Sequence, residues 1–427
     1  MWAWPRRATA LPHADDGHGP DLRVSPDDIA PAPGRGPGPG PGPGLGHEGL
    51  TDDHRACIVV LMSSFVHGGA ERHAITLINH FSRSLRVVLV YLKPDLSLLP
   101  HVERARLADL VFLDAASRKL DFDAVRRLTR LIDTHRPKLV LCVNIYPLMY
   151  LHLALRKSRA APVIVDIFHT TLLRTWKEQA QMVLYRPFIW ATDQMVFVCQ
   201  NQRSHWRRRA LFSRRNDVIH NGVDTAYFAP RLSAPQRLQG RARHGWRSDD
   251  RVVGISAVLR PEKAHRLLLE AVARLKAEGL NWKVLIIGDG PERTALEADV
   301  LRLGLLRDVH ITGLLPDVRE AIELCDVMAL VSVSETFSIA ALEAMALGKP
   351  MVMSDVGGAR EQVTHGAHGF LFASRDADAL ADVLRECAQP GRLPELARRA
   401  RARVEKEFSL QAMLAAYGQL LARYLDR

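Results

Sequence analysis

The sequence is poor in cysteine and lacks long hydrophobic runs, and both features limit what the protein can be. Its longest apolar runs, at 57–62 and 87–92, are far shorter than the ~20 residues that cross a bilayer, so no transmembrane helix is predicted. The amino terminus has no apolar stretch typical of a signal peptide. The five cysteines lie far apart, at positions 57, 142, 199, 325 and 387. They form no CxxC pair and no zinc spacing, so we expect buried, reduced thiols in a cytoplasmic protein.

The first 50 residues differ in composition from the rest of the 427-residue chain. They contain ten of its 28 glycines and ten of its 24 prolines, including the alternating run 34–44. Such a segment buries too little apolar surface to offset the entropy of ordering it, so 1–50 is predicted to be a disordered tail. The remaining length is typical of two domains.

Short β-branched runs alternate with helical patterns after residue 54, which predicts an α/β fold with two parallel sheets covered on both faces. The nine runs are 57–62, 86–92, 138–144, 163–168, 195–199, 251–258, 283–290, 327–332 and 350–356. The series breaks between 221 and 249, so we expect domains at 51–225 and 226–407. A last helix with an apolar stripe is expected in 408–427. Parallel sheets bind ligands at the carboxyl ends of their strands, so a cleft between the domains is the expected site.

Gly68 and Gly69 follow the first predicted strand and precede a helix predicted over 70–81. Paired glycines let a ligand approach the backbone, and the free N–H groups of a helix start attract anions. The pattern is not GxGxxG, and 91–93 read Tyr-Leu-Lys where a dinucleotide-binding protein would place a ribose-binding acid. A tight turn without a ligand is the alternative.

In the second half, Arg260 and Lys263 follow a strand, with Pro261 beginning a turn into the next helix. Two fixed cations there can hold a diphosphate and stabilise the charge that develops as it leaves. Gly288 and Gly290 lie at the following strand-to-helix turn, which either faces a nucleotide or is only a turn. Pro291 is expected at the first position of the next helix.

Glu335 leaves a strand, and Glu343 follows eight residues later within an apolar helical pattern. A carboxylate is seldom placed in such surroundings unless it is paired or used. If the segment were wholly helical, the pair would be roughly 12 Å apart. Glycosidase carboxylates stand about 5–9.5 Å apart, so two diols at opposite ends of a long ligand suit this pair better. A helix cap and a salt bridge are the structural alternative.

His169 ends a strand at the edge where cleft residues belong, although a lone histidine is often structural. The Asp-x-Asp stretches at 121–123 and 376–378 precede helices and are predicted to be N-caps, so no metal site is expected.

Most of the chain's net charge of +11 is concentrated in 151–215, where twelve Lys and Arg stand against three acids. The interleaved aromatic residues are Trp176, Tyr185, Trp190 and Trp206. This pattern is typical of a surface that rests on anionic lipid, and a solvated face is the alternative. No nucleic-acid-binding motif accompanies it, so no nucleic acid partner is expected.

Taken together, these motifs resemble the family 4 retaining glycosyltransferases with the GT-B fold, over roughly residues 55 to 425. The resemblance depends on the order and spacing of the series, namely GGAER at 68, His169, NGVD at 221, RPEK at 260, GDGP at 288, SETFS at 334 with Glu335 and Glu343, and DVGGAREQV at 355.

The resemblance implies two Rossmann-like domains, the first for the acceptor and the second for a nucleotide sugar, with the last helix crossing back to the first domain. It implies transfer of a hexose from a UDP- or GDP-sugar such as GDP-mannose, with retention, no metal and no cofactor. Because the basic, aromatic segment 151–215 belongs to the acceptor domain, the acceptor is expected to be lipid-linked or a growing polysaccharide. The cytoplasmic enzyme is then expected to be peripheral to the membrane.

By the same resemblance, Lys263 holds the donor diphosphate with Arg260 as partner, Glu335 grips the sugar and Glu343 the ribose. The other implied positions are the donor loop at Gly288 and Gly290, the backbone at Phe337 and Ser338, His169 at the reacting centre, and Gly68, Gly69 and Arg72 near the phosphates or the acceptor.

Two residues depart from the family pattern. Many members have their arginine where this chain has Val258, and many have glycine where it has Thr336, which can narrow the sugar pocket. An inverting GT-B transferase or epimerase, a NAD-dependent Rossmann oxidoreductase and an inactive membrane scaffold are the alternatives.

Overall fold

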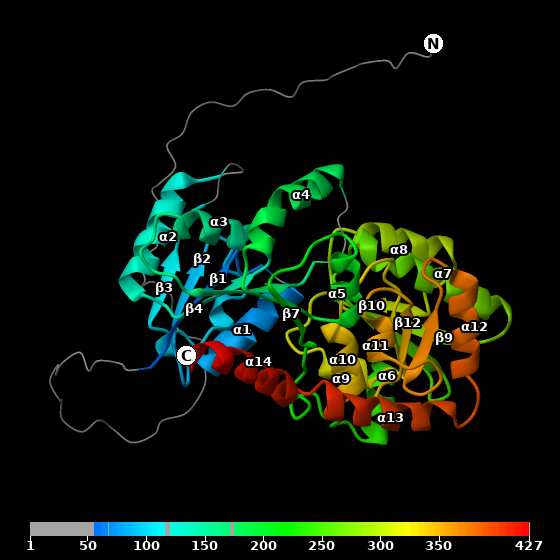
Figure 1. Ribbon diagram of the computed structural model, residues 1–427. Coiled ribbons are helices and arrows are strands. Elements are labelled where there is room, and N and C mark those ends of the chain that lie inside the picture. The colour runs from blue at the N-terminus through cyan, green and yellow to red at the C-terminus, as the bar shows by residue number, and fades with distance from the viewer. Residues whose placement is uncertain (1–54, 67, 116–119, 171–174, 427) are drawn as a thin grey trace, which may run out of the picture. The chain divides into compact units, whose positions relative to one another are not determined.

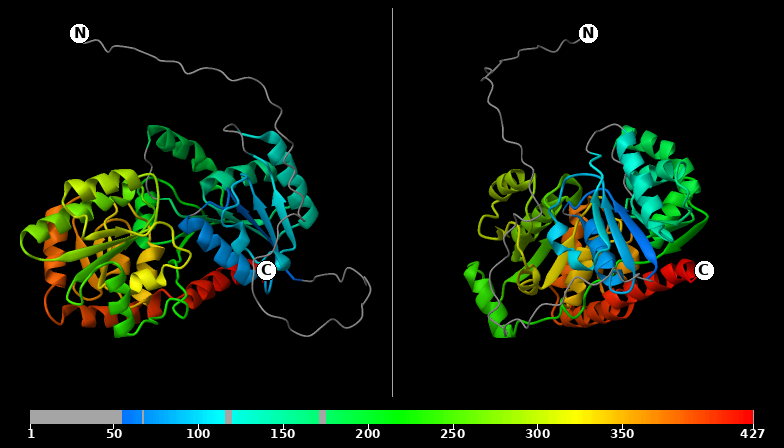
Figure 2. Two further views of the ribbon diagram at one scale, coloured as in Figure 1. Left: turned by 180° about the vertical axis from the view of Figure 1, so that it is seen from behind. Right: turned by 90° about the vertical axis from the view of Figure 1, so that its left-hand side faces the viewer.

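The computed structural model describes residues 55–66, 68–115, 120–170 and 175–426. The predicted disordered tail, 1–50, lies outside the described residues. Two all-parallel sheets organise the described chain (Figures 1 and 2), as the sequence predicts.

The first sheet has seven strands in the order β3-β2-β1-β4-β5-β6-β7. The strands are β1 Cys57–Met62, β2 Arg86–Tyr91, β3 Asp109–Phe112, β4 Leu139–Val143, β5 Val163–Phe168, β6 Gln194–Phe197 and β7 Arg215–Val218. The connecting helices are α1 Gly69–Phe81, α2 Phe122–His135, α3 Ile145–Leu155, α4 Trp176–Trp190 and α5 Gln200–Arg207. The chain order reverses between β1 and β4, which makes their carboxyl ends the topological switch point of this sheet.

The second sheet has six strands in the order β10-β9-β8-β11-β12-β13, with its switch point between β8 and β11. The strands are β8 Arg251–Ser256, β9 Trp282–Ile287, β10 Val309–Ile311, β11 Val327–Leu330, β12 Met351–Ser354 and β13 Gly369–Phe372. The helices that follow β7 are α6 Ala234–Arg243, α7 His265–Ala277, α8 Arg293–Arg302, α9 Arg319–Glu323, α10 Ile339–Ala346, α11 Ala359–Gln362, α12 Ala377–Cys387, α13 Arg392–Glu407 and α14 Leu410–Leu425.

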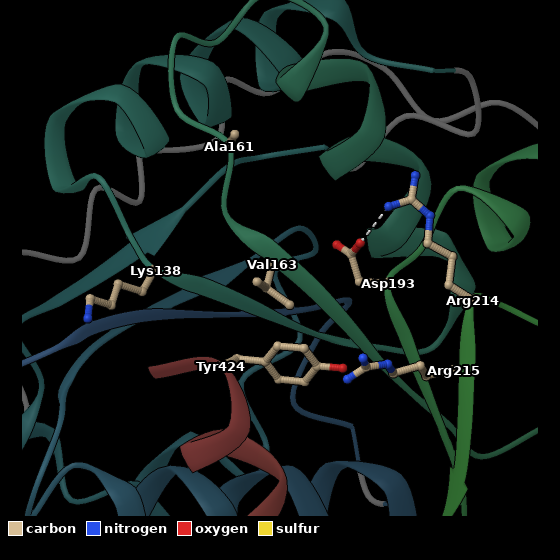
Figure 3. Close-up of a pocket in the computed structure, with 7 residues that line it drawn as sticks. All are labelled: Lys138, Ala161, Val163, Asp193, Arg214, Arg215 and Tyr424. Carbon is tan, nitrogen blue, oxygen red and sulfur yellow. Dashed lines mark hydrogen bonds and ion pairs between the residues drawn. The ribbon is translucent and has the colours of Figure 1, made fainter. Parts of the chain in front are cut away.

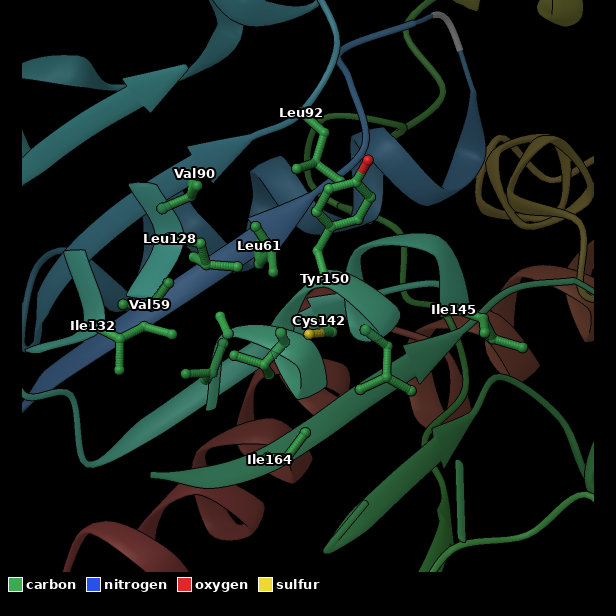
Figure 4. Packing of buried hydrophobic residues seen from close by; sticks show 14 of the residues in the cluster. Val59, Leu61, Val90, Leu92, Leu128, Ile132, Cys142, Ile145, Tyr150 and Ile164 are labelled. Carbon is green, nitrogen blue, oxygen red and sulfur yellow. The ribbon is translucent and has the colours of Figure 1, made fainter. Parts of the chain in front are cut away.

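Helices cover both faces of the first sheet. Successive residues of a strand point to opposite faces, so each strand contributes side chains to both packed layers. Val59 and Leu61 of β1 pack with Leu128 of α2 and Tyr150 of α3 (Figure 4). Val60 of β1, on the other side, packs with α1 and α14. The near-continuous apolar runs of the central strands follow from this double coverage.

Helix α14, the last of the chain, packs on the first sheet beside α1 (Figure 1). Its buried stripe contains Met413, Tyr417 and Leu420, and the last two are fully buried. Met413 and Leu420 each contribute roughly 1.5–3 kcal/mol through the apolar surface they bury. The chain therefore returns to its first sheet after completing the second.

All five cysteines are free and buried, as predicted. Asp121 and Asp376 accept hydrogen bonds from the first turns of α2 and α12, which confirms the two predicted N-caps. No helix of the described ranges is long and apolar enough to cross a membrane.

Candidate active site

The predicted functional residues gather at the carboxyl ends of strands near both switch points. Gly68 and Gly69 follow β1, and His169 follows β5 in the first sheet. Lys263 follows β8, and Glu335 follows β11, so these two come from the strands that border the second switch point. This is the edge at which open parallel sheets bind ligands.

Lys263 and Glu335 contact each other directly. Lys263 ends the short 3₁₀ helix Pro261–Lys263, and its Nζ lies 2.5 Å from Oε2 of Glu335. About a fifth of each side chain is exposed, so the pair lies below the surface but remains accessible. One cation and one carboxylate, 72 residues apart in the chain, therefore meet between β8 and β11.

Arg260, the predicted partner of Lys263, is exposed and lines a different space. A cavity of about 360 Å³ runs along the starts of α7 and α8, and its lining includes Arg260, Arg266, Glu270 and Arg375 but neither Lys263 nor Glu335. The structure thus does not bring Arg260 into the Lys263–Glu335 pair.

Glu343 lies on α10 in a buried, apolar setting. Burial raises its pKa to about 7, and the charge of Arg72 on α1 opposes this rise, since Nη1 of Arg72 is 4.0 Å from Oε1 of Glu343. Ser338 caps α10, which begins only at Ile339, so the stretch from Glu335 to Glu343 is not one helix. The distance of roughly 12 Å assumed for a continuous helix therefore does not apply.

The start of α1, in the first domain, lies against the start of α10, in the second domain. The N-cap of α1, Gly68, has no side chain to satisfy the first N–H groups of the helix. A Cβ atom on Gly69 would lie 3.7 Å from Cδ1 of Ile339, so the glycine turn lies beside the first residue of α10. Gly69, Arg72 and Glu343 are therefore neighbours in the folded chain.

His169 is held by both of its backbone polar groups. Its N–H donates to Oδ1 of Asn144 at 3.0 Å, and its carbonyl accepts from the hydroxyl of Thr336, also at 3.0 Å. Burial lowers the pKa of His169 to about 4, so the imidazole is neutral at pH 7. Its ring centroid is 5.0 Å from that of His73, a buried histidine of α1 that the sequence analysis missed.

The segment 337–338 is engaged by protein partners. The carbonyl of Phe337 accepts from Nδ2 of Asn221 at 3.0 Å, and Gln362 accepts from the N–H of Ser338 and donates to its carbonyl. Asn221 and Gln362 belong to the NGVD and DVGGAREQV motifs, so these two motifs shape the loop that carries Glu335.

Gly288 and Gly290 have a structural reason to be glycine. Both have positive φ, and a Cβ atom would lie 2.2 Å from the carbonyl oxygen of Ala257 at Gly288 and 2.6 Å from that of Leu259 at Gly290. The two loops after β8 and β9 therefore pack backbone against backbone. The prediction for Pro291 is wrong, because α8 begins at Arg293 and Pro291 lies in the turn before it.

The prediction for the basic, aromatic segment is partly wrong. Trp206 and Tyr185 belong to the buried core of the first domain, and only Trp176 and Trp190 are exposed. The sequence analysis missed the exposed apolar residues Val183, Leu184 and Phe212. We call Val183, Leu184, Trp176 and Trp190, which all belong to α4, the α4 patch. Arg174, one of the twelve cations, lies outside the described residues.

A second cavity, of about 490 Å³, lies at the opposite edge of the first sheet, where β4 to β7 begin (Figure 3). Two of its cations already have partners, since Lys138 donates to the carbonyl of Leu425 and Arg214 pairs with Asp193. It contains none of the predicted site residues. Over the described ranges, no three or more His, Cys, Asp and Glu side chains group as a metal site would require.

The sequence profile described as "Glycosyltransferase Family 4" matches residues 67–227, and the profile "Glycosyl transferases group 1" matches residues 236–406. The putative glycosyltransferase EpsD of Bacillus subtilis is 28% identical over 312 residues, which cover 70% of this chain and 80% of EpsD. The D-inositol 3-phosphate glycosyltransferase of Mycolicibacterium smegmatis is 32% identical over 225 residues, about half of each chain.

Solved structures share the fold. HepE of Anabaena, solved in complex with UDP-glucose, superposes with a TM-score of 0.75 at 21% identity, covering 86% of this chain and 99% of HepE. Sucrose-phosphate synthase of Thermosynechococcus elongatus gives a TM-score of 0.72 at 19% identity, covering 86% and 99%. With the two family profiles, the two Rossmann-like sheets and the motifs at their switch points, the chain belongs to the family 4 glycosyltransferases of GT-B fold.

Proposed function

We propose that the protein moves a hexose from a UDP- or GDP-sugar to a lipid-linked or polysaccharide acceptor, with retention and without a metal or other cofactor. The observation that carries this proposal is the Lys263–Glu335 pair between β8 and β11, because a bound donor offers a separate partner to each group. The ammonium suits the diphosphate, and the carboxylate suits sugar hydroxyls.

In the proposed reaction, the bond between the anomeric carbon and the diphosphate breaks, and its electron pair stays on the diphosphate. Lys263 stabilises this charge, with Arg260 as a more distant second cation of the same loop. The acceptor oxygen bonds to the anomeric carbon on the same face, and its proton passes to the departing diphosphate. Glu335 orients the sugar, and the neutral ring of His169 lies beside the reacting centre.

Glu343 is proposed to accept the ribose hydroxyls, and the start of α1 at Gly68, Gly69 and Arg72 to face the phosphates or the acceptor. The neighbour solved with UDP-glucose supports a UDP donor, and GDP-mannose remains part of the proposal. Turnover of nucleotide sugars in EDTA tests the donor and the metal independence. An inverted product would instead support the inverting alternative.

The acceptor side is proposed to rest on anionic lipid at the cytoplasmic face of a membrane. Trp176 is 73% exposed and Leu184 68% exposed on α4, within the segment that carries most of the net charge. Apolar side chains surrounded by cations bind the interface of an anionic bilayer, and each cation near the surface contributes roughly 1 kcal/mol. A lipid-linked acceptor would be reached from this position.

Vesicle binding tests the membrane contact. The protein should sediment with vesicles containing anionic lipid at low salt. The double variant Trp176→Ala/Leu184→Ala should bind these vesicles at least tenfold more weakly, because it removes the two most exposed apolar side chains of the α4 patch. The matched control is Leu301→Ala/Leu306→Ala, which removes two leucines of similar exposure outside α4. Failure of the unaltered protein to sediment would contradict the membrane contact.

A further inference from the structure

Glu361 lies on α11, within the DVGGAREQV motif. The proposed reaction gives it no role, yet its side chain contacts the first domain. Its carboxylate accepts the backbone N–H groups of Gln200 and Asn201, both at 2.8 Å, at the start of α5. Nε2 of His220 lies 3.0 Å from the same carboxylate. Burial alone would raise the pKa of Glu361, but these hydrogen bonds, led by His220, hold it below its usual value. A side chain of the second domain therefore satisfies the free N–H groups of a first-domain helix.

Helix α5 in turn holds the backbone on both sides of His169. Gln202 is fully buried, and its Nε2 donates to the carbonyls of Phe168 at 2.8 Å and of Thr170 at 3.1 Å. Nε1 of Trp206, one turn further along α5, donates to the same Thr170 carbonyl at 2.8 Å. Both carbonyls that flank His169 are thus fixed by α5.

The carbonyl between them belongs to His169 itself and accepts from Thr336, next to Glu335. The three successive carbonyls of residues 168–170 therefore all accept hydrogen bonds. The carbonyls of Phe168 and Thr170 bind side chains of α5, and the carbonyl of His169 binds the loop that carries Glu335. The position of α5 relative to the second domain sets the position of His169 relative to Glu335. Two contacts from the second domain hold the start of α5: Glu361 accepts from Gln200 and Asn201, and the carbonyl of Thr336 accepts from Sγ of the N-cap Cys199 at 3.4 Å. Glu361 is the charged contact of the two and binds two N–H groups of the helix.

We propose that Glu361 is a positioning residue that holds His169 against the Glu335 loop through α5. This inference rests on the proposed function, in which His169 and Glu335 lie on either side of the donor sugar. It assigns a role to an acid that touches neither donor nor acceptor. Its effect falls on the geometry of the reacting centre and not on the proposed diphosphate and ribose contacts of Lys263 and Glu343, which both belong to the second domain.

A double-mutant cycle tests whether Glu361 acts through His169. Glu361→Ala should lower kcat at least tenfold while KM for the nucleotide sugar changes less than threefold. Glu361→Gln, which keeps one acceptor oxygen, should recover part of the loss. In a His169→Ala background, Glu361→Ala should lower kcat by less than twofold. Equal losses in both backgrounds, or an unchanged kcat, would overturn the proposal.

Hydrogen exchange gives a readout that does not depend on activity. Peptides covering 163–170 and 200–207 should exchange at least fivefold faster in Glu361→Ala, because α5 loses the acceptor at its start. Glu395→Ala is the control, since Glu395 pairs with Arg399 on its own helix, and it should leave these peptides unchanged. Unchanged exchange in Glu361→Ala contradicts the positioning role. Absence of donor turnover in the unaltered protein contradicts the proposed function instead.

Discussion

Replacing Lys263 by alanine should lower the turnover number about 100- to 1,000-fold while the protein stays folded. Removing one group that stabilises charge in a transition state costs this much in characterised enzymes. The ammonium of Lys263 lies 2.5 Å from the carboxylate of Glu335, so the two charges neutralise each other. Glu335→Ala should show a comparable loss, because the sugar then has no carboxylate to orient it. Steady-state turnover of the donor measures both.

The control for this experiment is Lys276→Ala. Lys276 also pairs with a carboxylate, Asp308, at 2.8 Å in the same domain, but it lies at the end of α7 away from the switch point. Its loss should leave turnover within threefold of the unaltered protein. If Lys263→Ala behaves like this control, the diphosphate is not held by Lys263. Thermal unfolding of each variant shows that the loss is not one of folding.

Glu343→Gln should weaken nucleotide binding and remove its dependence on pH. The ionised carboxylate can accept two ribose hydroxyls, whereas the protonated group and the amide accept less well. Because burial raises the pKa of Glu343 to about 7, the group is mostly protonated at pH 6 and mostly ionised at pH 8. If only the ionised form binds, affinity for UDP or GDP should rise about tenfold between these two values, in proportion to the ionised fraction.

A thermal-shift series with UDP, GDP, ADP, NAD and NADP in EDTA measures this binding. A ligand at 100 times its Kd stabilises the folded protein by about 2.7 kcal/mol. The matched control is Glu323→Gln, which alters another buried glutamate of the same domain and should keep the pH dependence. A shift that is the same in Glu343→Gln and in the unaltered protein would contradict the ribose contact, and a shift with NAD alone would contradict a nucleotide-sugar donor.

Most of the fold could be predicted because the central strands are buried on both faces. All nine predicted strands are present, and they occupy the interior of the two sheets. The four that sequence analysis missed are the edge strands, β3, β7, β10 and β13. An edge strand has one neighbour and is often partly exposed, as β3 and β7 are, so it needs no continuous apolar run. The pattern that predicts a central strand is therefore weak at the edges.

The candidate site could be predicted in part for a similar reason. Lys263, Glu335 and His169 belong to segments that follow buried strands. Such segments lie at the carboxyl edge of a parallel sheet, so a correct prediction of the strands also places these residues. Arg260 shows the limit of this argument, because proximity in sequence to Lys263 does not fix where a long side chain turns.

The roles that sequence analysis missed depend on contacts between segments that are distant in the chain. Glu361 binds the start of α5, 160 residues earlier in the chain, and Thr336 binds the carbonyl of His169 from the other domain. Trp206 reads as a surface aromatic beside three arginines, yet it is buried against Phe168. Pairings of this kind depend on the tertiary packing of segments that are distant in the chain, which no local sequence pattern encodes.

Donor turnover with product analysis tests the central claim most directly. UDP- and GDP-hexoses are incubated with the protein in EDTA, with and without lipid-linked acceptors. NMR then follows the release of the nucleoside diphosphate and determines the anomeric configuration of the product. We expect that one donor is consumed, that the configuration is retained, and that Lys263→Ala lowers turnover about 100- to 1,000-fold. Consumption of no nucleotide sugar, or turnover in Lys263→Ala within threefold of the unaltered protein, would contradict this claim.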